Sequence, residues 1–434
     1  MPRAFASPLW RNGAFVRIWT AATISIFGSL ITRMALPFVA ILVLSAGPFE
    51  VAILRSLDVL AATGFGLVAG VWVDRLRRRP VLIWADVGRA LLLASVPLAF
   101  VLGVLTLAQL FAVTLMTAVL TTFFDAADNA YLPTVVRREQ LVDANSAIAA
   151  SGSAAEFTAF GVSGFLVQVF TAPIAILVDA VSFVASALLL GSIRATEPSP
   201  PPAAGRRRIA AEIRDGLALV RHEPVLRALA LTEMTHGVLW GVFGATYLLF
   251  AFQVLQLGPA AIGLITGAGG LGSLIGALVA GRATRRWGIG PTAVGGLLLA
   301  ALGNAFVPLA PAGAPILAAG FLVAQQLVGD GGDTMYAISE QTVRQATVEN
   351  QLLGRVASTI LVASGAAQLV ATLAAGLLAE VIGLRAVAVI APLGALCGAA
   401  VIWFSPVWRL RIHELGASPT EVAEERALDR PPGA

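Results

Sequence analysis

The sequence contains no lysine, one cysteine and three histidines, and only 12% of its 434 residues are charged. The single thiol, Cys397, lies within an apolar run, so an internal disulfide or a thiolate metal site is excluded. His222, His236 and His413 are too scattered for a zinc cluster. Without lysine, the chain also lacks the Gly-x-x-x-x-Gly-Lys-Ser/Thr loop that binds ATP phosphates. We therefore expect no metal, no cofactor and no enzymatic activity.

Apolar residues dominate the composition. Hydrophobic residues make up 58% of the chain, and the mean hydropathy is +0.85. A water-soluble domain carries about twice this charged fraction. The sequence pI of about 10.1 could indicate nucleic-acid binding, but the arginines stand between apolar segments, where basic residues set membrane orientation. The composition predicts a membrane protein that does not bind nucleic acid.

Twelve apolar runs reach the length of about 20 residues that a membrane helix needs. The first run is far longer than the core of a signal peptide and lacks a clear cleavage site, so we expect it to stay in the mature protein. The expected spans are 17–45, 50–72, 81–103, 108–132, 145–170, 173–193, 227–254, 258–281, 291–311, 314–337, 353–382 and 384–405. The sequence thus predicts an all-α integral membrane protein of twelve transmembrane helices.

Arginine placement predicts the orientation of these spans. The termini, the loops near 75–79, 137–138, 282–286 and 344–355, and the central segment 194–227 hold most of the arginines. The alternate loops are a few residues long and hold almost none, with Arg385 as the exception. Because basic loops stay in the cytoplasm, we expect both termini to be cytoplasmic in a bacterial inner membrane.

The central segment divides the chain into two halves. It begins with a Pro-rich stretch, 197–205, and continues with Ile209, Ile213, Leu217 and Val220 at helical spacing, which is typical of an amphipathic surface helix. The expected parts are an N-terminal six-helix bundle (1–193), a cytoplasmic linker with this helix (194–226), a C-terminal six-helix bundle (227–405) and a cytoplasmic tail (406–434).

The two halves repeat short motifs at a nearly constant offset. Gly66 and Gly70 precede an arginine cluster, as do Gly272 and Gly276, and Asp125-Ala-Ala-Asp128 corresponds to Asp330-Gly-Gly-Asp333. Such internal similarity is typical of parallel repeats, between which a carrier holds its site. The Gly-x-x-x-Gly pairs predict close helix packing.

The stretch Gly70-Val-Trp-Val-Asp74-Arg75-Leu-Arg77-Arg78-Arg79 resembles the loop signature of the major facilitator superfamily, Gly-x-Leu-x-Asp-Arg-x-Gly-Arg-Arg, with Arg77 in place of the second glycine. The stretches 30–37, 123–127, 138–141 and 179–183 resemble the enterobactin-exporter and macrolide-efflux branch. The helix 5 exporter signature is reduced to Gly161 and Gly164, without its proline. The resemblance implies the major facilitator fold and export by alternating access. It also implies a gating role for the loop residues Gly70, Asp74, Arg75, Arg78 and Arg79. From their position near the arginine-rich rim, we expect Asp128 and Asp333 to act in gating as well, as ties between helices that break and reform.

Each ionisable residue within a span raises the free energy of membrane insertion by about 2.5–3.5 kcal/mol, so its presence needs a structural or functional explanation. Ion pairing between helices is one interpretation, and proton exchange in a low-dielectric cavity is the other. The candidates for lining the cavity or coupling protons are Arg33, Asp58, Asp125, Glu156, Glu233, His236 and Asp330. We expect Asp125 and Asp330 to be further from water than Asp128 and Asp333, which we expect to pair with Arg137, Arg138 and Arg344.

The sequence therefore predicts a proton-coupled exporter of small amphipathic compounds, such as a drug, natural product or siderophore, acting as a monomer among membrane lipids. A lipid or lysolipid flippase of the same fold is the first alternative. A non-transporting membrane scaffold or a membrane-embedded enzyme is the alternative of another class, although no nucleophile–base constellation supports an enzyme.

Overall fold

The computed structural model describes residues 8–73, 75–193, 209–349 and 352–410, and within these ranges it contains helices and no strands. The long helices of the first half are α1 (Gly13–Phe38), α2 (Pro48–Val73), α3 (Arg78–Val101), α4 (Leu107–Val135), α5 (Leu141–Phe170) and α6 (Ala172–Gly191). Those of the second half are α8 (Pro224–Leu249), α9 (Pro259–Trp287), α10 (Ile289–Leu309), α11 (Pro315–Thr347), α12 (Leu353–Ile382) and α14 (Ile390–Trp403), the last preceded by the short α13 (Leu384–Ala388).

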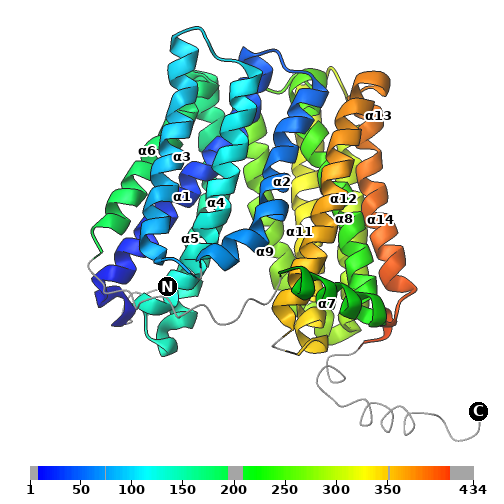
Figure 1. The fold of residues 1–434 in the computed structure, drawn as a ribbon. Coiled ribbons are helices and arrows are strands. Elements are labelled where there is room, and N and C mark those ends of the chain that lie inside the picture. The colour runs from blue at the N-terminus through cyan, green and yellow to red at the C-terminus, as the bar shows by residue number, and fades with distance from the viewer. Residues whose placement is uncertain (1–7, 74, 194–208, 350–351, 411–434) are drawn as a thin grey trace, which may run out of the picture.

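Ten helical segments in the described residues are long and apolar enough to cross a membrane. α2 and α11 are not among them, although they have 26 and 33 residues and lie within the bundle (Figure 1). In α11, the polar residues Gln325, Gln326, Asp330 and Asp333 lower the mean hydropathy. The all-helical membrane fold is confirmed, whereas the count of twelve spans stays a prediction.

Local sequence determines where several helices begin. Asn12 caps α1 by accepting from the backbone N–H groups of Ala14 and Phe15, and Thr106 caps α4 by accepting from that of Gln109. α8, α9 and α11 have proline in their first turn, where a missing N–H costs nothing.

The two halves share an irregularity that the sequence motifs did not indicate. α1 continues into a π-helical turn, Val39–Val43, and α8 continues into another, Phe250–Val254. Each turn is followed by a non-glycine residue with φ of 55°, Ser45 and Gln256. If the two halves arose by duplication of one six-helix unit, both would retain the same irregular helix end.

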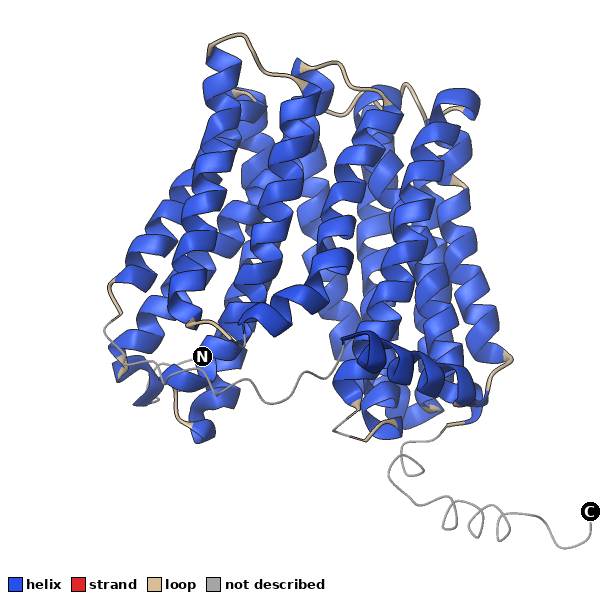
Figure 2. Ribbon diagram, in the orientation of Figure 1, coloured by secondary structure: helices blue, strands red, loops and turns tan. Residues whose placement is uncertain are grey.

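The halves contact each other mainly at the end opposite the arginine-rich loops. There α2 packs on α12 and α5 packs on α9, and one apolar cluster includes residues of both halves. Phe38 and Phe252, for example, meet edge to face at 6.1 Å. At the arginine-rich end each half has its own apolar cluster, and the halves diverge (Figure 2). The structure is therefore closed at one end and open at the arginine-rich end.

The expected surface helix is present as α7 (Ile209–His222), which crosses the arginine-rich end beside α12 (Figure 1). Its apolar residues do not all pack against the bundle. Val220 is buried, but Leu217 is 56% exposed, and the closest approach is at Gly216, where a Cβ would lie 2.9 Å from the carbonyl oxygen of Arg355. Residues 194–208, including the Pro-rich stretch, and 411–434 of the expected tail lie outside the described residues.

Candidate functional site

A cavity of about 510 Å³ lies between the two halves. Its walls come from α1, α2, α4, α5 and α6 of the first half and from α8, α9, α11 and α12 of the second. Five of the seven residues proposed from the sequence line it: Arg33, Asp58, Asp125, Glu156 and Asp330. Arg55 and Asp179 line it as well. Charged side chains from both halves thus share one cavity.

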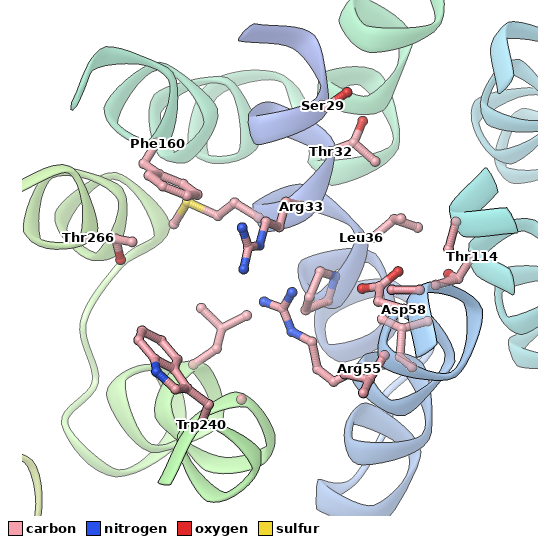
Figure 3. Close-up of a pocket in the computed structure, with 18 of the residues that line it drawn as sticks. Ser29, Thr32, Arg33, Leu36, Arg55, Asp58, Thr114, Phe160, Trp240 and Thr266 are labelled. Atoms are coloured by element: carbon pink, nitrogen blue, oxygen red, sulfur yellow. The ribbon is translucent and has the colours of Figure 1, made fainter. Parts of the chain in front are cut away.

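Arg33 of α1 and Arg55 of α2 form the basic part of the cavity. Their guanidinium groups extend into the same open space (Figure 3), and the two charges act on each other. Asp58 lies one turn after Arg55, but its carboxylate is on the side of Leu36 and Thr114 (Figure 3). Among the residues that the structure describes, no carboxylate oxygen lies within 4.0 Å of either guanidinium group.

An aromatic wall on α8 faces this basic part. Trp240, Phe243 and Tyr247 lie on one side of the helix because their spacing is three and four residues. Phe243 stacks on Tyr247 with ring centroids 4.4 Å apart, and Trp240 meets Phe243 at 5.5 Å. All three residues line the cavity. Figure 3 shows the indole of Trp240 across the open space from Arg33.

His236 and Glu233 do not line this cavity. His236 Nε2 lies 3.0 Å from an Asp333 carboxylate oxygen and 3.3 Å from Trp240 Nε1, so the pair sits behind the aromatic wall. The ring of Tyr336 lies 5.4 Å from that of His236. Glu233 is on the same helix, where its carbonyl oxygen accepts from Ser364 of α12.

Asp333 therefore has a different partner from the one expected. Arg344 lies 3.3 Å from Glu340, one turn away on the same helix, while Asp333 pairs with His236. The expected exposure of the Asp-x-x-Asp elements is also reversed. Asp125 is exposed and Asp128 is half-buried, and Asp330 is half-buried while Asp333 is only 8% exposed. Asp125 and Asp330 lie deeper along their helices, but they face the cavity and are therefore more exposed than Asp128 and Asp333.

The sequence reasoning missed a buried ion pair on α3. Arg89, 2% exposed, pairs with Asp86 and lies between the rings of Phe124 and Phe183, whose centroids are 4.3 and 4.1 Å from its guanidinium carbon. Arg89 also donates to Thr121, which lines the cavity, at 3.3 Å. The sequence could have indicated this pair, because Asp86 and Arg89 are spaced three residues apart within an apolar run.

Asp179 of α6 is 1% exposed and accepts from Ser182 Oγ at 3.0 Å. It lies against α1 at Gly28, where a Cβ would come within 2.8 Å of Ser182 Cβ. Glycine at this position lets α1 and α6 approach closely around the buried carboxyl group.

Arg75, Arg78 and Arg79 of the expected gating loop lie at the arginine-rich end. Asp74 is outside the described residues, and Arg75 is exposed. Arg78 and Arg79 begin α3, and Arg79 donates to the carbonyl oxygens of Leu190, at 2.9 Å, and Gly191, which closes the end of α6. These contacts join helices within the first half.

The two Gly-x-x-x-Gly pairs differ in their surroundings. A Cβ at Gly272 would lie 2.9 Å from the carbonyl oxygen of Leu327, and a Cβ at Gly276 would lie 2.9 Å from Gly331, so α9 and α11 are in backbone contact. A Cβ added at Gly66 or Gly70 would have no described atom of a neighbouring element within 4 Å. Among the described residues, the predicted close packing is therefore present at the pair in the second half and not at the pair in the first.

Within the described residues, no three histidine, cysteine or acidic side chains are grouped so that they could hold a metal ion. The chemistry that this site offers is therefore ionic contact, hydrogen bonding, ring stacking and proton exchange.

Known proteins with a similar sequence or structure are transporters. The family described as "Transmembrane secretion effector" matches residues 4–429. The uncharacterized MFS-type transporter YfiS of Bacillus subtilis (strain 168) is 25% identical over 391 residues, covering 87% of this chain and 89% of that protein. The multidrug efflux pump Tap of Mycolicibacterium fortuitum is 29% identical over 423 residues, covering 94% of this chain and 99% of that protein.

The fold comparison agrees with these sequence relatives. The crystal structure of the nucleoside transporter NupG superposes with a TM-score of 0.73 at 13% sequence identity, over 90% of this chain and 98% of that chain. At this identity the likeness concerns the fold alone.

Proposed function

Because this chain belongs to the Transmembrane secretion effector family of major facilitator transporters, we propose that it exports small amphipathic compounds by proton-coupled alternating access. It is a multi-pass membrane transporter and not an enzyme. The proposal of efflux draws on the relative named as a multidrug efflux pump, which the chain covers almost completely. The substrate class and the coupling to protons are our inference from the cavity.

The observation that carries the proposal is the charged cavity between two halves that meet mainly at one end. Ionisable residues are retained inside a membrane protein where a substrate or ion path needs them. Rocking the halves about this cavity would close the arginine-rich end and open the other, which is the motion expected of parallel repeats. The arginine-rich end is the cytoplasmic side in this proposal, in a bacterial inner membrane.

Proton coupling is assigned to the carboxyl groups that face the cavity. Glu156 comes from α5 in the first half and Asp330 from α11 in the second, and they are close enough to act on each other electrostatically. Two carboxylates repel when both are charged, so protonation of one favours the state in which the halves bring them together. Movement of the halves would then change the proton affinity of the pair.

Uptake by everted membrane vesicles tests this function. An imposed pH gradient, acidic inside, should drive amphipathic dyes into vesicles that contain the protein, and collapse of the gradient should release them. Each pH unit supplies enough free energy for about tenfold accumulation per exchanged proton. Accumulation that does not respond to the gradient would contradict proton coupling. Movement of fluorescent lysolipids and not of dyes would favour a flippase instead.

A further inference from the structure

We infer that the transported compound is an organic anion with a flat aromatic ring, held with its anionic group between Arg33 and Arg55 and its ring against Trp240. This inference deepens the proposed function, on which it rests, by naming a substrate class. It starts from a charge imbalance at one place in the cavity.

Arg33 and Arg55 lie in the part of the cavity nearer the closed end. Arg55 is in the first third of α2 and Arg33 in the last third of the segment Gly13–Val43, so both are beyond the middle of the membrane from the open end. Asp125, Glu156 and Asp330 lie in the middle of their helices or closer to the open end. Asp58 and Asp179 also line the cavity nearer its closed end, but the carboxylate of Asp58 lies on the side of Leu36 and Thr114 (Figure 3) and Asp179 is only 1% exposed. The open space beside Arg33 and Arg55 is therefore basic, whereas the cavity is acidic toward its entrance.

The two guanidinium groups are balanced only in part by the described residues, because Asp58 acts on both of them electrostatically but forms an ion pair with neither. Asp58 and the acidic residues are more than 4.0 Å away, and neither group lies over an aromatic ring as Arg89 does. Two like charges facing one space of low dielectric repel, and an anion between them removes this cost. A guanidinium group also binds carboxylate, sulfonate or phosphate oxygens through paired N–H groups.

The aromatic wall on α8 provides the second set of contacts for the compound. Trp240 stands across the open space from the arginines (Figure 3), and its N–H is directed away from the cavity, to His236. Edge-to-face packing against His236 and Phe243, whose ring centroids lie 6.2 and 5.5 Å away, holds the indole in place, so that its face is available for a ring in the cavity. Phe243 and Tyr247 continue the apolar surface toward the closed end. A molecule that fits both walls has an anionic group on a flat ring.

The test compares three probes that share one ring system: naphthalene-2-sulfonate, naphthalene-2-methanol and (2-naphthylmethyl)trimethylammonium. Binding to the full chain in nanodiscs of zwitterionic lipid is measured by equilibrium dialysis. The sulfonate should bind on the order of tenfold or more tightly than the other two probes. Arg33→Gln and Arg55→Gln should each weaken sulfonate binding by about tenfold or more and leave binding of the neutral alcohol unchanged.

Two further variants make the result specific. Arg282→Gln removes one positive charge from the exposed end of α9 and should leave sulfonate binding unchanged. Trp240→Leu should weaken the binding of all three probes. Equal sulfonate binding by Arg33→Gln, Arg55→Gln and the unaltered chain would overturn the inference, as would preferential binding of the ammonium probe.

Transport of the same probes separates this inference from the proposed function. If a pH gradient drives the ammonium probe while the sulfonate neither binds nor moves, the export function stands and the anion site is wrong. If the sulfonate binds through the two arginines but no gradient moves it, the anion site stands and the export function is wrong.

Discussion

Two kinds of buried charge can be distinguished at the scale of single residues. Asp86 and Arg89, and likewise His236 and Asp333, are paired inside one half and away from the cavity. Arg33, Asp125, Glu156 and Asp330 face the cavity without such partners in the described residues. The first kind holds helices together, and the second is available to substrate and protons.

Asp330→Asn should abolish the response of transport to a pH gradient, because its carboxyl group reaches the cavity and is set against Glu156 of the other half. Accumulation per pH unit should fall from about tenfold to about onefold. Asp128→Asn is the matched control, since Asp128 is half-buried and does not line the cavity. Uptake by vesicles at several imposed gradients measures both. An equal loss in the two variants would show that these residues have a structural role only.

Asp86→Ala should destabilise the protein by about 3–5 kcal/mol, because it leaves the charge of Arg89 buried between two rings without its carboxylate. The double variant Asp86→Ala/Arg89→Leu should recover most of the stability, since it removes both charges. Thermal unfolding of the purified variants in one detergent provides the comparison. The pair contributes no stability if all three proteins unfold at the same temperature.

At the scale of helices, the closed end contains two related hydrogen bonds between the halves. Gln168, near the end of α5, accepts from the backbone N–H of Ala260 in the first turn of α9, at 3.1 Å. Glu380, near the end of α12, accepts from that of Phe49 in the first turn of α2, at 3.4 Å. Both satisfy N–H groups that a helix start leaves free, and both must break when this end opens.

Gln168→Ala and Glu380→Ala should therefore shift the population toward the state that is open at this end. One such hydrogen bond is worth about 0.5–1.5 kcal/mol, so each change should alter the ratio of states by about two- to tenfold. Spin labels at Val104 and Ala312, one on each half, report the distance across this end.

Gln109→Ala provides the control for this shift, because Gln109 donates to Ser95 within the first half. Its distance distribution should match that of the unaltered protein. Identical distributions in all three variants would mean that apolar packing alone, such as that of Gly164 against Ala260 and Gly263, keeps this end closed.

For the whole molecule, the features that depend on local sequence could be predicted. Span length, arginine placement and the repeated glycine and aspartate motifs indicated the helical membrane fold, because each is set within one helix or loop. The partners of buried charges could not be predicted, because they depend on how each helix is rotated about its axis. His236 and Trp240 share α8 at a spacing of four residues, yet Trp240 faces the cavity and His236 faces Asp333.

The orientation in the membrane decides whether this cavity serves export, because the structure is open at the arginine-rich end. A chain with Cys397→Ser allows single cysteines to be labelled. Ala218→Cys, exposed on α7, should react with a membrane-impermeant thiol reagent only from the cytoplasmic side, and Ala312→Cys, exposed between α10 and α11, only from the outside. Ala312 is preferable to its neighbour Gly313, whose φ of 84° disfavours any other residue.

The native Cys397 offers an internal control for this labelling. It is exposed on the side of α14, in the middle of a span, so the bilayer should shield it from the impermeant reagent on either side. With the predicted pattern, the open cavity faces the cytoplasm and can collect compounds there, as an exporter must. The reverse pattern would place the arginine-rich end on the outside and would contradict the predicted orientation.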